Sequence, residues 1–585
     1  MDKLSVSSVW QIKHTKNCNI CKDCALEFSD LESYVSLHKI IRLSGKYNFE
    51  SSRIPVNSGL NISFIRKCLH DYHDFAVCDL LEYGWPVGHL GTPVRSSTVR
   101  NHKGATNFSA DIHNYLRKEK SYHAVVGPFK ANPFIEDMAI SPLNSVPKKD
   151  SIERRVIVDL SFPEGLAVND GISKDLYLGE KVSVHYPTVD DFVRLIKKKG
   201  RNCKIFKRDL RRAYRQLVID PGDIHLMGYK WKGHIYFDRV LTMGLRSAAY
   251  ICMRTTSAIR FICQKNGIQI LNYLDDLAGC EEEHYCNFAF DFLGKLLQDC
   301  GIEESVDKAC PPSTRMIFIG ILFDTQKLTI AIDENRLTEI RLLVECWMHK
   351  MMASKKELQS LLGKLNFVAQ CVKPGRICIS RLLNWLREIS DKDSFCIPLD
   401  LKLDLLWWNT FLPLYNGVSI MLSEEFSSPD EILSVDACLL GCGGWMNGRY
   451  FHSSFPNFLF DQNLNINLCE MLTIVVALKL WGLMLVNKKV VINCDNMVSV
   501  RVLNTGASRN SFLQSCLREI CYIAALNNFD IKSQHISGCD NRIADTLSRW
   551  DLHDKFRRDF KQLTSDLEVI EDFVSDEFFL FSHVW

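Results

Sequence analysis

The stretch LNYLDDLAG, residues 271–279, places two acidic residues, Asp275 and Asp276, side by side in an apolar run. Ionised carboxylates are costly to bury unless they are paired, hydrogen-bonded or bound to a metal ion. One explanation is a plain hairpin of two short strands, because turns favour Asp and short acidic turns are common. The other is a metal site at the tip of that hairpin. The stretch alone leaves both open, so the rest of the chain has to decide between them.

Length and composition describe a soluble protein with several domains. A chain of 585 residues is too long for one core, and we expect about three or four domains. Its 46% hydrophobic and 24% charged residues exclude a disordered or fibrous protein. No apolar stretch reaches the roughly 20 residues of a membrane helix, because the best candidate, residues 474–485, is short and contains Lys479. The first residues lack the apolar core of a secretory signal.

Cysteine usage and charge indicate the compartment and the kind of partner. The 23 scattered cysteines suit reduced thiols better than a disulfide framework, so we expect a cytoplasmic or nuclear protein. The net charge is only +2, but residues 194–215 contain 11 Lys or Arg and a single acid, Asp209. A solvated basic face is the usual interpretation of such a run. One aspartate inside it is unusual.

Hydrophobic patterning divides the chain into segments of different type. Residues 55–135 are helical in places, and residues 140–330 alternate short apolar strands, MIFIGILFD among them, with amphipathic helices. Residues 333–387 are mainly helical. A second α/β segment runs from EILSVDA to ADTLSRW in the order strand, strand, strand, helix, strand, helix, helix, strand, helix. Residues 566–577 contain six acids and no basic residue, so we expect them to be solvated and mobile.

A first set of carboxylates lies in the strand-rich segment. Asp209 ends the apolar strand CKIFKRDL, and neighbouring strands of one sheet could bring it to Asp275. Three carboxylates at one place repel each other unless cations neutralise them. Mg²⁺ suits such a site, and two ions about 4 Å apart would serve an in-line phosphoryl transfer. Basic residues would then hold a polyanion while the acids hold metal.

A second set lies in the later α/β segment. Asp436 and Asp495 end two strands, and Glu470 and Asp545 lie on helices. Each acid alone is more easily explained as a surface residue or a helix cap. Four carboxylates in this arrangement again indicate a two-metal centre.

Several motifs resemble those of reverse transcriptases over about residues 125–390. YLDDL resembles the catalytic hairpin, and DLRRAYRQL resembles the strand with the first catalytic Asp. SPLNSVPKKDSIERRVIVDLS, LTMGLRSAAY and SVDKACPPSTRMIFIGILF resemble the next blocks in the family's order. The resemblance implies that Asp209, Asp275 and Asp276 hold Mg²⁺ or Mn²⁺, two ions per site. It also implies substrate contacts by Lys148 and Arg155 at the triphosphate, by Met243 and Gly244 at template and nucleotide, and by Lys308.

Tyr214 follows Asp209 by five residues, where this family has an aromatic residue that excludes a 2′-hydroxyl and favours deoxynucleotides. A core aromatic on a helix is the alternative explanation. Met243 departs from relatives that often have Phe or Gln, and because Met packs adaptably we expect altered nucleotide contacts rather than lost chemistry.

The second set resembles RNase H, with Asp436, Glu470, Asp495 and Asp545 as implied metal ligands. His535 would assist the departing product or relay protons, and Asn496 would contact the nucleic-acid strand. HISG followed by ADTLSR is the stronger evidence for the resemblance to RNase H, and NCDN alone is weak evidence. A polymerase and a nuclease together imply copying of RNA into DNA and cleavage of the RNA strand of the hybrid. We expect the hybrid to bridge both sites and to be recognised by shape and 2′-hydroxyls.

The resemblances imply a right-hand polymerase followed by an RNase H-like domain, in a mixed α/β and α+β multidomain chain. The implied segments are an N-terminal region of uncertain role (1–120), fingers and palm (121–330), a helical thumb (331–390), a connection (391–428), an RNase H-like domain (429–550) and an acidic C-terminal tail (551–585).

Further stretches, such as VIVDLSFPEGLAVNDGI and KKELQSLLGKLNFVAQCVKPGR, resemble the DIRS and Ngaro retrotransposons. We find no aspartic-protease motif and no integrase, which fits this group and also fits a truncated polyprotein. The group implies an element-encoded tyrosine recombinase and a capsid-like protein as partners.

The remaining motif is HTKNCNICKDC near the start. Cys18, Cys21 and Cys24, with His14 or His38 nearby, could bind Zn²⁺, although close cysteines in a cysteine-rich chain can also be accidental.

We therefore predict an RNA-directed DNA polymerase with RNase H activity, whose partners are an RNA template, a DNA primer, RNA–DNA hybrid and deoxynucleoside triphosphates, without a membrane. The alternative is a domesticated, non-catalytic nucleic-acid-binding protein, which should have lost some carboxylates. An RNA-dependent RNA polymerase is disfavoured by Tyr214 and by the attached nuclease.

Overall fold

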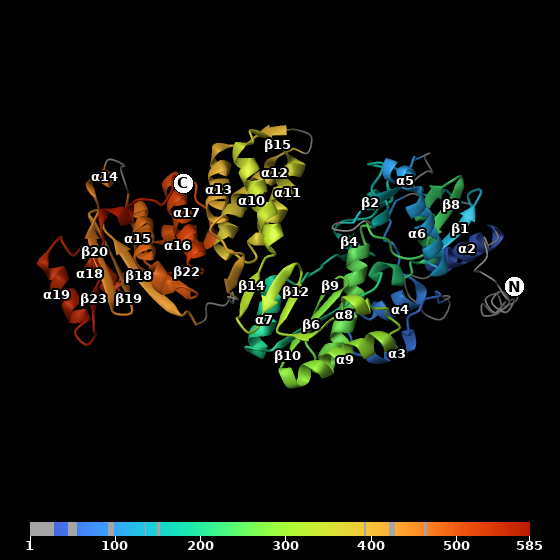
Figure 1. Ribbon diagram of the computed structural model, residues 1–585, viewed down its shortest axis with the longest axis horizontal. Coiled ribbons are helices and arrows are strands. Elements are labelled where there is room, and N and C mark those ends of the chain that lie inside the picture. The colour runs from blue at the N-terminus through green and yellow to red at the C-terminus, as the bar shows by residue number, and fades with distance from the viewer. Residues whose placement is uncertain are drawn as a thin grey trace. The chain divides into compact units, whose positions relative to one another are not determined.

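The computed structural model describes residues 28–44, 55–91, 99–134, 136–148, 153–390, 394–420, 428–460 and 465–585. The chain forms two compact units. The first consists of residues 1–187 and 203–313, and the second of residues 188–202 and 314–585. Both units combine sheets with helices (Figure 1), which confirms the mixed α/β multidomain fold class predicted from the sequence.

The central sheet of the first unit has four antiparallel strands in the order β11-β6-β10-β9. They are β6 (Lys204–Asp209), β9 (Ile270–Tyr273), β10 (Asp276–Glu281) and β11 (Cys310–Ser313). Helices α8 (Ala248–Lys265) and α9 (Glu283–Asp299) pack against it. Ile205, Phe206 and Leu277 are fully buried, so apolar side chains anchor the two central strands whose ends carry the aspartates.

Smaller elements complete the first unit. A three-stranded sheet has the order β1-β8-β7, and two hairpins pair β2 with β3 and β4 with β5. The strands are β1 (Val125–Phe129), β2 (Leu143–Pro147), β3 (Arg154–Val158), β4 (Leu176–Tyr177), β5 (Glu180–Lys181), β7 (Gly228–Trp231) and β8 (His234–Asp238). The helices are α2 (Phe28–Ser44), α3 (Ile62–Cys68), α4 (Ala76–Tyr83), α5 (Lys103–Asn107) and α6 (Ser109–Ser121). Short 3-10 turns are η1 (Val168–Gly171), η2 (Ala213–Gln216), η3 (Pro221–Leu226) and η4 (Val306–Lys308). One hydrophobic cluster extends from Leu31 in α2 to Leu297 in α9.

The second unit contains α7 (Val189–Lys199), an antiparallel sheet and a group of helices. The sheet order is β12-β13-β14-β17, from β12 (Arg315–Phe318), β13 (Ile321–Asp324), β14 (Thr329–Ala331) and β17 (Val418–Ile420). The helices are α10 (Glu334–His349), α11 (Lys355–Val368), α12 (Ile377–Glu388) and α13 (Leu399–Phe411), with the turn η5 (Lys373–Arg376) and the hairpin of β15 (Met352–Ser354) and β16 (Ser394–Cys396). MIFIGILFD, predicted as one strand, forms the hairpin β12–β13 because Gly320, with φ +82°, permits a turn inside it.

The second unit also contains a six-stranded sheet in the order β22-β21-β18-β19-β20-β23. β18, β21 and β22 are parallel to one another, β19 is antiparallel to both β18 and β20, and β23 is parallel to β20. The strands are β18 (Glu431–Ala437), β19 (Gly441–Met446), β20 (Arg449–Ser454), β21 (Lys489–Cys494), β22 (Asp530–His535) and β23 (Ile570–Glu571). The helices are α14 (Asn457–Phe460), α15 (Ile466–Trp481), α16 (Met497–Thr505), α17 (Ser511–Leu526), α18 (Arg542–Ser548) and α19 (Asp554–Leu563), with the turns η6 (Gly482–Leu485) and η7 (Asp576–Phe579). Apart from the short α14, the order up to α18 is the predicted one.

The stretch Ile466–Leu485, which comprises α15 and η6, is long and apolar enough by composition to cross a membrane. It is longer than the apolar stretch 474–485 identified in the sequence. However, 78% of its apolar window is buried inside the protein. The stretch serves as a core helix, since α15 packs against β18 and α17.

The C-terminal segment differs from the expectation of a mobile acidic tail. Most of residues 566–577 are exposed, as expected, but β23 pairs with β20. The carboxylate of Asp572 accepts a hydrogen bond from Trp481 Nε1 at 2.8 Å and pairs with Arg449. Phe579 and Trp585 are buried. The segment therefore has contacts that its composition did not indicate, from strand pairing, from Asp572 and from buried apolar residues that follow the acids.

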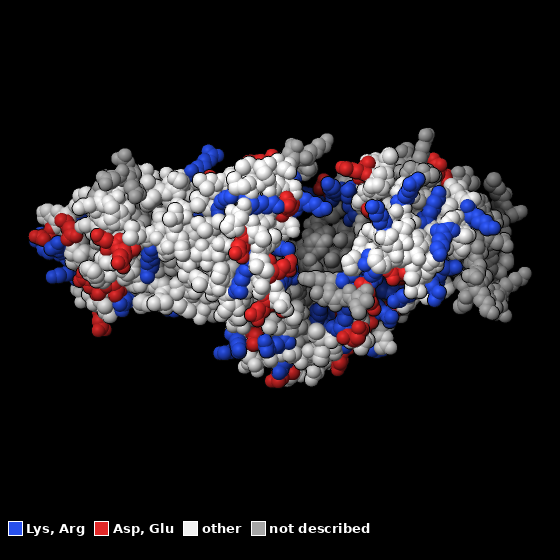
Figure 2. All heavy atoms as spheres, turned by 45° about the horizontal axis from the view of Figure 1, so that its top comes forward, with Lys and Arg blue, Asp and Glu red and all other residues white. Residues whose placement is uncertain are grey.

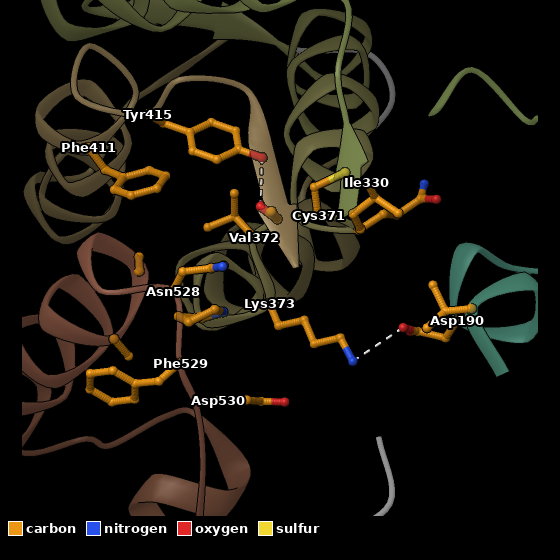
Figure 3. A pocket seen from close by; sticks show the side chains of 16 residues that line it. Asp190, Ile330, Cys371, Val372, Lys373, Phe411, Tyr415, Asn528, Phe529 and Asp530 are labelled. Carbon is orange, nitrogen blue, oxygen red and sulfur yellow. Dashed lines mark hydrogen bonds and ion pairs between the residues drawn. The ribbon is translucent and has the colours of Figure 1, made fainter. Parts of the chain in front are cut away.

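A small cavity of about 20 Å³ lies inside the second unit, between α7, η5 and the loop before β22 (Figure 3). Lys373 Nζ lies 3.2 Å from Asp190 Oδ1, and Tyr415 Oη lies 2.7 Å from Ser419 Oγ. This volume has room for about one water molecule. Polar side chains from distant parts of the sequence therefore join α7 to the rest of the second unit.

We expect Glu519→Gln to lower the melting temperature of the second unit. The buried Glu519 carboxylate accepts hydrogen bonds from Ser582 N at 3.0 Å and Ser582 Oγ at 2.6 Å, and Lys479 Nζ lies 3.0 Å away. An amide would direct its NH₂ group at donors and leave the lysine unpaired, at a cost of about 2–4 kcal/mol. Thermal unfolding followed by circular dichroism measures the loss. The exposed Glu568→Gln is the control, and an equal effect of both variants would contradict the prediction.

Candidate active sites

Three aspartates meet at one edge of the four-stranded sheet. Asp209, the last residue of β6, lies directly opposite Asp276, the first residue of β10. Leu210 N donates a hydrogen bond to the carbonyl of Asp275 at 2.8 Å. Leu274, with φ +55°, makes the tight turn between β9 and β10. The hairpin predicted from the sequence therefore exists, and it brings its two acids to Asp209.

Burial disfavours the ionised form of these aspartates, and two nearby lysines partly compensate for their negative charge. Burial raises the pKa of Asp275, and the nearby Asp209 raises it further. Burial also raises the pKa of Asp276, against the effect of Lys207, whose Nζ lies 3.1 Å from Asp276 Oδ1. Lys308 Nζ lies 3.2 Å from Asp209 Oδ1. The carboxylates thus already attract cations, and oxygen ligands of this kind fit Mg²⁺.

Sequence analysis missed Lys207. Its position two residues before Asp209 on the same strand places both side chains on one face of the sheet, and this spacing could have identified it. Lys308 was predicted to contact substrate and here lies beside Asp209.

Tyr214 lies on the turn η2, close to the aspartates. Its ring is half-buried and packs against the core of the first unit. Burial raises the pKa of the phenol, and the neighbouring Cys252 and Asp275 raise it further. The side chain therefore remains neutral and has Asp275 as a neighbour, and its role as a gate for the nucleotide sugar stays a prediction.

Met243 and Gly244 lie in an exposed loop, and the buried side-chain amide of Asn169 fixes the loop backbone by hydrogen bonds. Asn169 Nδ2 donates to the carbonyl of Gly244 at 2.7 Å, and its Oδ1 accepts from Arg246 N at 2.8 Å. Gly244 has φ +94°, a conformation that suits glycine. Met243 is 48% exposed, so its side chain is available to a ligand. Asn169 was overlooked, because nothing in the stretch AVND indicates a partner 75 residues away.

Lys148 and Arg155 lie on the β2–β3 hairpin rather than on the four-stranded sheet. Arg155 is exposed and lies opposite Val146. Lys148 forms an ion pair with Glu153 across the hairpin. Their predicted contact with a triphosphate stays a prediction.

The second set of carboxylates gathers at the six-stranded sheet. Asp436 lies near the end of β18, and Asp495 directly follows β21, the parallel neighbour of β18. Glu470 comes from α15, and its Oε1 accepts a hydrogen bond from Ala437 N at 3.2 Å. Asp545 comes from α18. Because neighbouring parallel strands end at the same edge, the sheet brings residues together that are far apart in the sequence.

Without a cation, some of the carboxyl groups of this second site remain protonated near neutral pH. Burial raises the pKa of Asp436 to about 7, and Asp495 and Asp545 add to the effect. Burial raises the pKa of Glu470 to about 9, and Asp436 and Asp495 add to it. Ligand atoms of Glu470, Cys494 and Asp495 all lie within 4.8 Å of one another. The donor set therefore fits a divalent cation, which would replace the protons.

Two neighbours of this site were not identified from the sequence. Ser548 Oγ donates a hydrogen bond to Asp436 Oδ2, and Arg549 forms an ion pair with Asp545. Both belong to the SR that closes ADTLSR, so the motif itself contained the signal. They orient two of the carboxylates.

His535 and Asn496 occupy different kinds of position. His535 ends β22 opposite Cys494 and is exposed, so it borders the site from the adjacent strand. The Oδ1 of Asn496 accepts hydrogen bonds from Val498 N and Ser499 N and caps α16, and its Nδ2 donates to Asn467 Oδ1 at 2.8 Å. The side chain of Asn496 thus has a structural use beside its predicted contact with nucleic acid.

The predicted zinc ligands Cys18, Cys21, Cys24 and His14 lie outside the described residues. The alternative ligand His38 is buried in α2.

The chain is similar to viral proteins, although no protein-family model matches it. It is 26% identical over 168 residues to Protein P of heron hepatitis B virus, covering 28% of this chain and 21% of that protein. It is 24% identical over 431 residues to the enzymatic polyprotein of cauliflower mosaic virus, strain Strasbourg, covering 70% of this chain and 57% of that protein. The chain therefore spans about a fifth and just over half of the lengths of these relatives.

Solved structures of a foamy viral protease-reverse transcriptase are also similar. One, in complex with double-stranded DNA, matches at 15% identity with a TM-score of 0.46, over 80% of this chain and 77% of that one. Another, in complex with an RNA/DNA hybrid, matches at 14% identity with a TM-score of 0.42, over 81% of this chain and 62% of that one.

Without divalent cations, we expect the stability of the second unit to fall as the pH rises from about 5 to 9. The folded pKa values of Asp436 and Glu470, about 7 and about 9, lie above their values in an unfolded chain. The folded state therefore binds more protons in this window, and its advantage is lost as they dissociate. Mg²⁺ should restore stability because it favours the ionised carboxylates.

Thermal unfolding in EDTA and in Mg²⁺ at several pH values measures this dependence. Glu470→Gln removes one of the two titrating groups and should flatten the EDTA curve. Equal pH dependence in the variant and the wild type would contradict the prediction.

Proposed function

We propose that the chain is an RNA-directed DNA polymerase with RNase H activity, and that each activity has its own carboxylate site. The observation that carries the proposal is the presence of two separate sets of converging carboxylates, one in each unit. A single set could serve many reactions, but synthesis of DNA on RNA and removal of the RNA strand require two centres. The similarity to viral enzymatic polyproteins supports the proposal.

At the first site, Asp209, Asp275 and Asp276 would hold two Mg²⁺ or Mn²⁺ ions. Such ions activate the primer 3′-hydroxyl and stabilise charge on the phosphates in an in-line displacement. Lys207 and Lys308 would release their carboxylates on metal binding and become available to phosphate oxygens. Tyr214 would exclude a ribose 2′-hydroxyl.

At the second site, Asp436, Glu470, Asp495 and Asp545 would hold the ions for hydrolysis of RNA. The neutral forms of Asp436 and Glu470 would be deprotonated by metal binding, so cleavage should need a divalent ion. His535, exposed beside the site, can exchange protons with the departing product.

The ligands of this protein would be an RNA template, a DNA primer, their hybrid and deoxynucleoside triphosphates. The nearly neutral net charge means that local basic density has to hold the polyanion. Figure 2 shows Lys and Arg side chains in number on one face of the molecule, interspersed with acidic ones. Binding should therefore weaken with salt.

We also propose that the chain derives from a retrotransposon of the DIRS and Ngaro group and works in the cytoplasm or the nucleus. The motifs VIVDLSFPEGLAVNDGI and KKELQSLLGKLNFVAQCVKPGR support this lineage. A tyrosine recombinase and a capsid-like protein of the same element would then be its partners.

The two sites can be tested separately. Asp275→Asn should abolish primer extension on RNA and leave hybrid cleavage intact, and Asp495→Asn should do the reverse, each by at least about a hundredfold. The purified protein is incubated with Mg²⁺, deoxynucleotides and a DNA primer on labelled RNA. Each variant is the folding control for the other. Tight hybrid binding by the wild type without extension or cleavage would instead favour a non-catalytic nucleic-acid-binding protein.

A further inference from the structure

The turn that carries Tyr214 has an unusual backbone. After Asp209 the chain leaves β6, and Arg212 adopts φ +52° and ψ +38°, the left-handed conformation. For a residue other than glycine this conformation is unfavourable and persists only where surrounding contacts impose it. Arg215 N donates a hydrogen bond to the carbonyl of Arg212 at 2.7 Å, which closes the turn around Tyr214.

The contacts that impose this conformation come from two arginines on either side of Tyr214. Arg212 Nη2 lies 2.7 Å from Glu119 Oε2, and Arg215 Nε lies 2.9 Å from the same oxygen. Arg215 Nη2 also lies 2.7 Å from Asp238 Oδ1. The guanidinium of Arg212 lies 3.6 Å from the ring centre of Tyr122.

These four charged residues form a buried and balanced group. Two guanidinium groups face two carboxylates, and Glu119 and Asp238 are 5% and 0% exposed. Removing one charge from such a group leaves the others buried without compensation, which is costly. Each member therefore fixes the positions of the others.

Glu119 comes from α6 in the N-terminal region, and Asp238 comes from the end of β8. Neither the carboxylate site nor its nucleic-acid ligands explain why charges should be buried here. The turn at Tyr214 connects the group to the carboxylate site. That turn is where a small displacement of a ring would change the space for a 2′-hydroxyl.

We propose that Glu119, Arg212, Arg215 and Asp238 are positioning residues that brace the turn of Tyr214 and thereby set how strictly the polymerase site rejects ribonucleotides. The proposal rests on the proposed polymerase function. It gives the N-terminal region a role in substrate selection. A reacting or discriminating group must be held to within a fraction of an ångström, and a misplacement of about 1 Å costs about a hundredfold.

The test compares incorporation of a deoxynucleotide with that of the matching ribonucleotide on an RNA template. The readout is the ratio of kcat/KM for dGTP to that for rGTP, measured with the full chain and Mg²⁺. Glu119→Gln keeps the size of the side chain and removes its charge, and it should lower this ratio at least about tenfold. Tyr214→Val, which removes the ring, shows how far the ratio can fall.

Asp74→Asn is the matched control. Asp74 pairs with Arg254 through two contacts of 2.8 and 2.7 Å in the same unit, so its loss removes a charge pair of similar geometry that is not a member of the proposed brace. Its ratio should stay within about twofold of the wild type. If Glu119→Gln fails to fold, Arg212→Lys is the second variant. It keeps the positive charge but lacks the several N–H directions of a guanidinium, so it should also lower the ratio.

A ratio in Glu119→Gln or Arg212→Lys that stays within twofold of the wild type would overturn the proposal, even if overall activity falls, because the group would then only support folding. An equal fall of the ratio in Asp74→Asn would overturn it as well. If the wild type extends the primer with neither nucleotide, the proposed function itself fails, and the brace as a selectivity device fails with it.

Discussion

Repulsion between buried carboxylates is the constraint on which both sites depend. In each unit the fold brings buried and half-buried acids close together, so each site must obtain positive charge or protons. The first site obtains charge from Lys207 and Lys308, which lie 3.1 and 3.2 Å from Asp276 and Asp209. The second site has Arg549 beside Asp545 but no such partner described for Glu470, whose pKa rises to about 9. Two solutions to one problem therefore occur in a single chain.

This difference has a consequence for metal binding. A cation entering the first site competes with ammonium groups, which can turn toward a phosphate. A cation entering the second site competes with protons, so its affinity must depend on pH. The two activities that we propose should therefore respond differently to acid, although both sites consist of carboxylates.

The sequence indicated the converging carboxylates better than their surroundings. Asp209 and Asp276 were predictable because an apolar strand with an acid at its end has a defined direction and a defined edge. Asn169, Glu119 and Asp238 were not, because each acts through contacts with residues distant in sequence. The C-terminal segment shows the same limit. Its composition indicated mobility, but a single carboxylate, Asp572, accepts from Trp481 and pairs with Arg449.

The contact of Glu119 with Arg212 and Arg215 also changes how the N-terminal region is understood. From sequence it was a region of uncertain role, in which the possible zinc motif HTKNCNICKDC was the one candidate for chemistry. In the structure, α6 contributes a buried carboxylate to the same cluster of charges as the motif DLRRAYRQL. An aromatic residue can be placed five positions after a catalytic aspartate by sequence alone. Holding its ring still requires contacts from elsewhere, and here a left-handed arginine is stabilised by a helix more than 90 residues earlier in the chain.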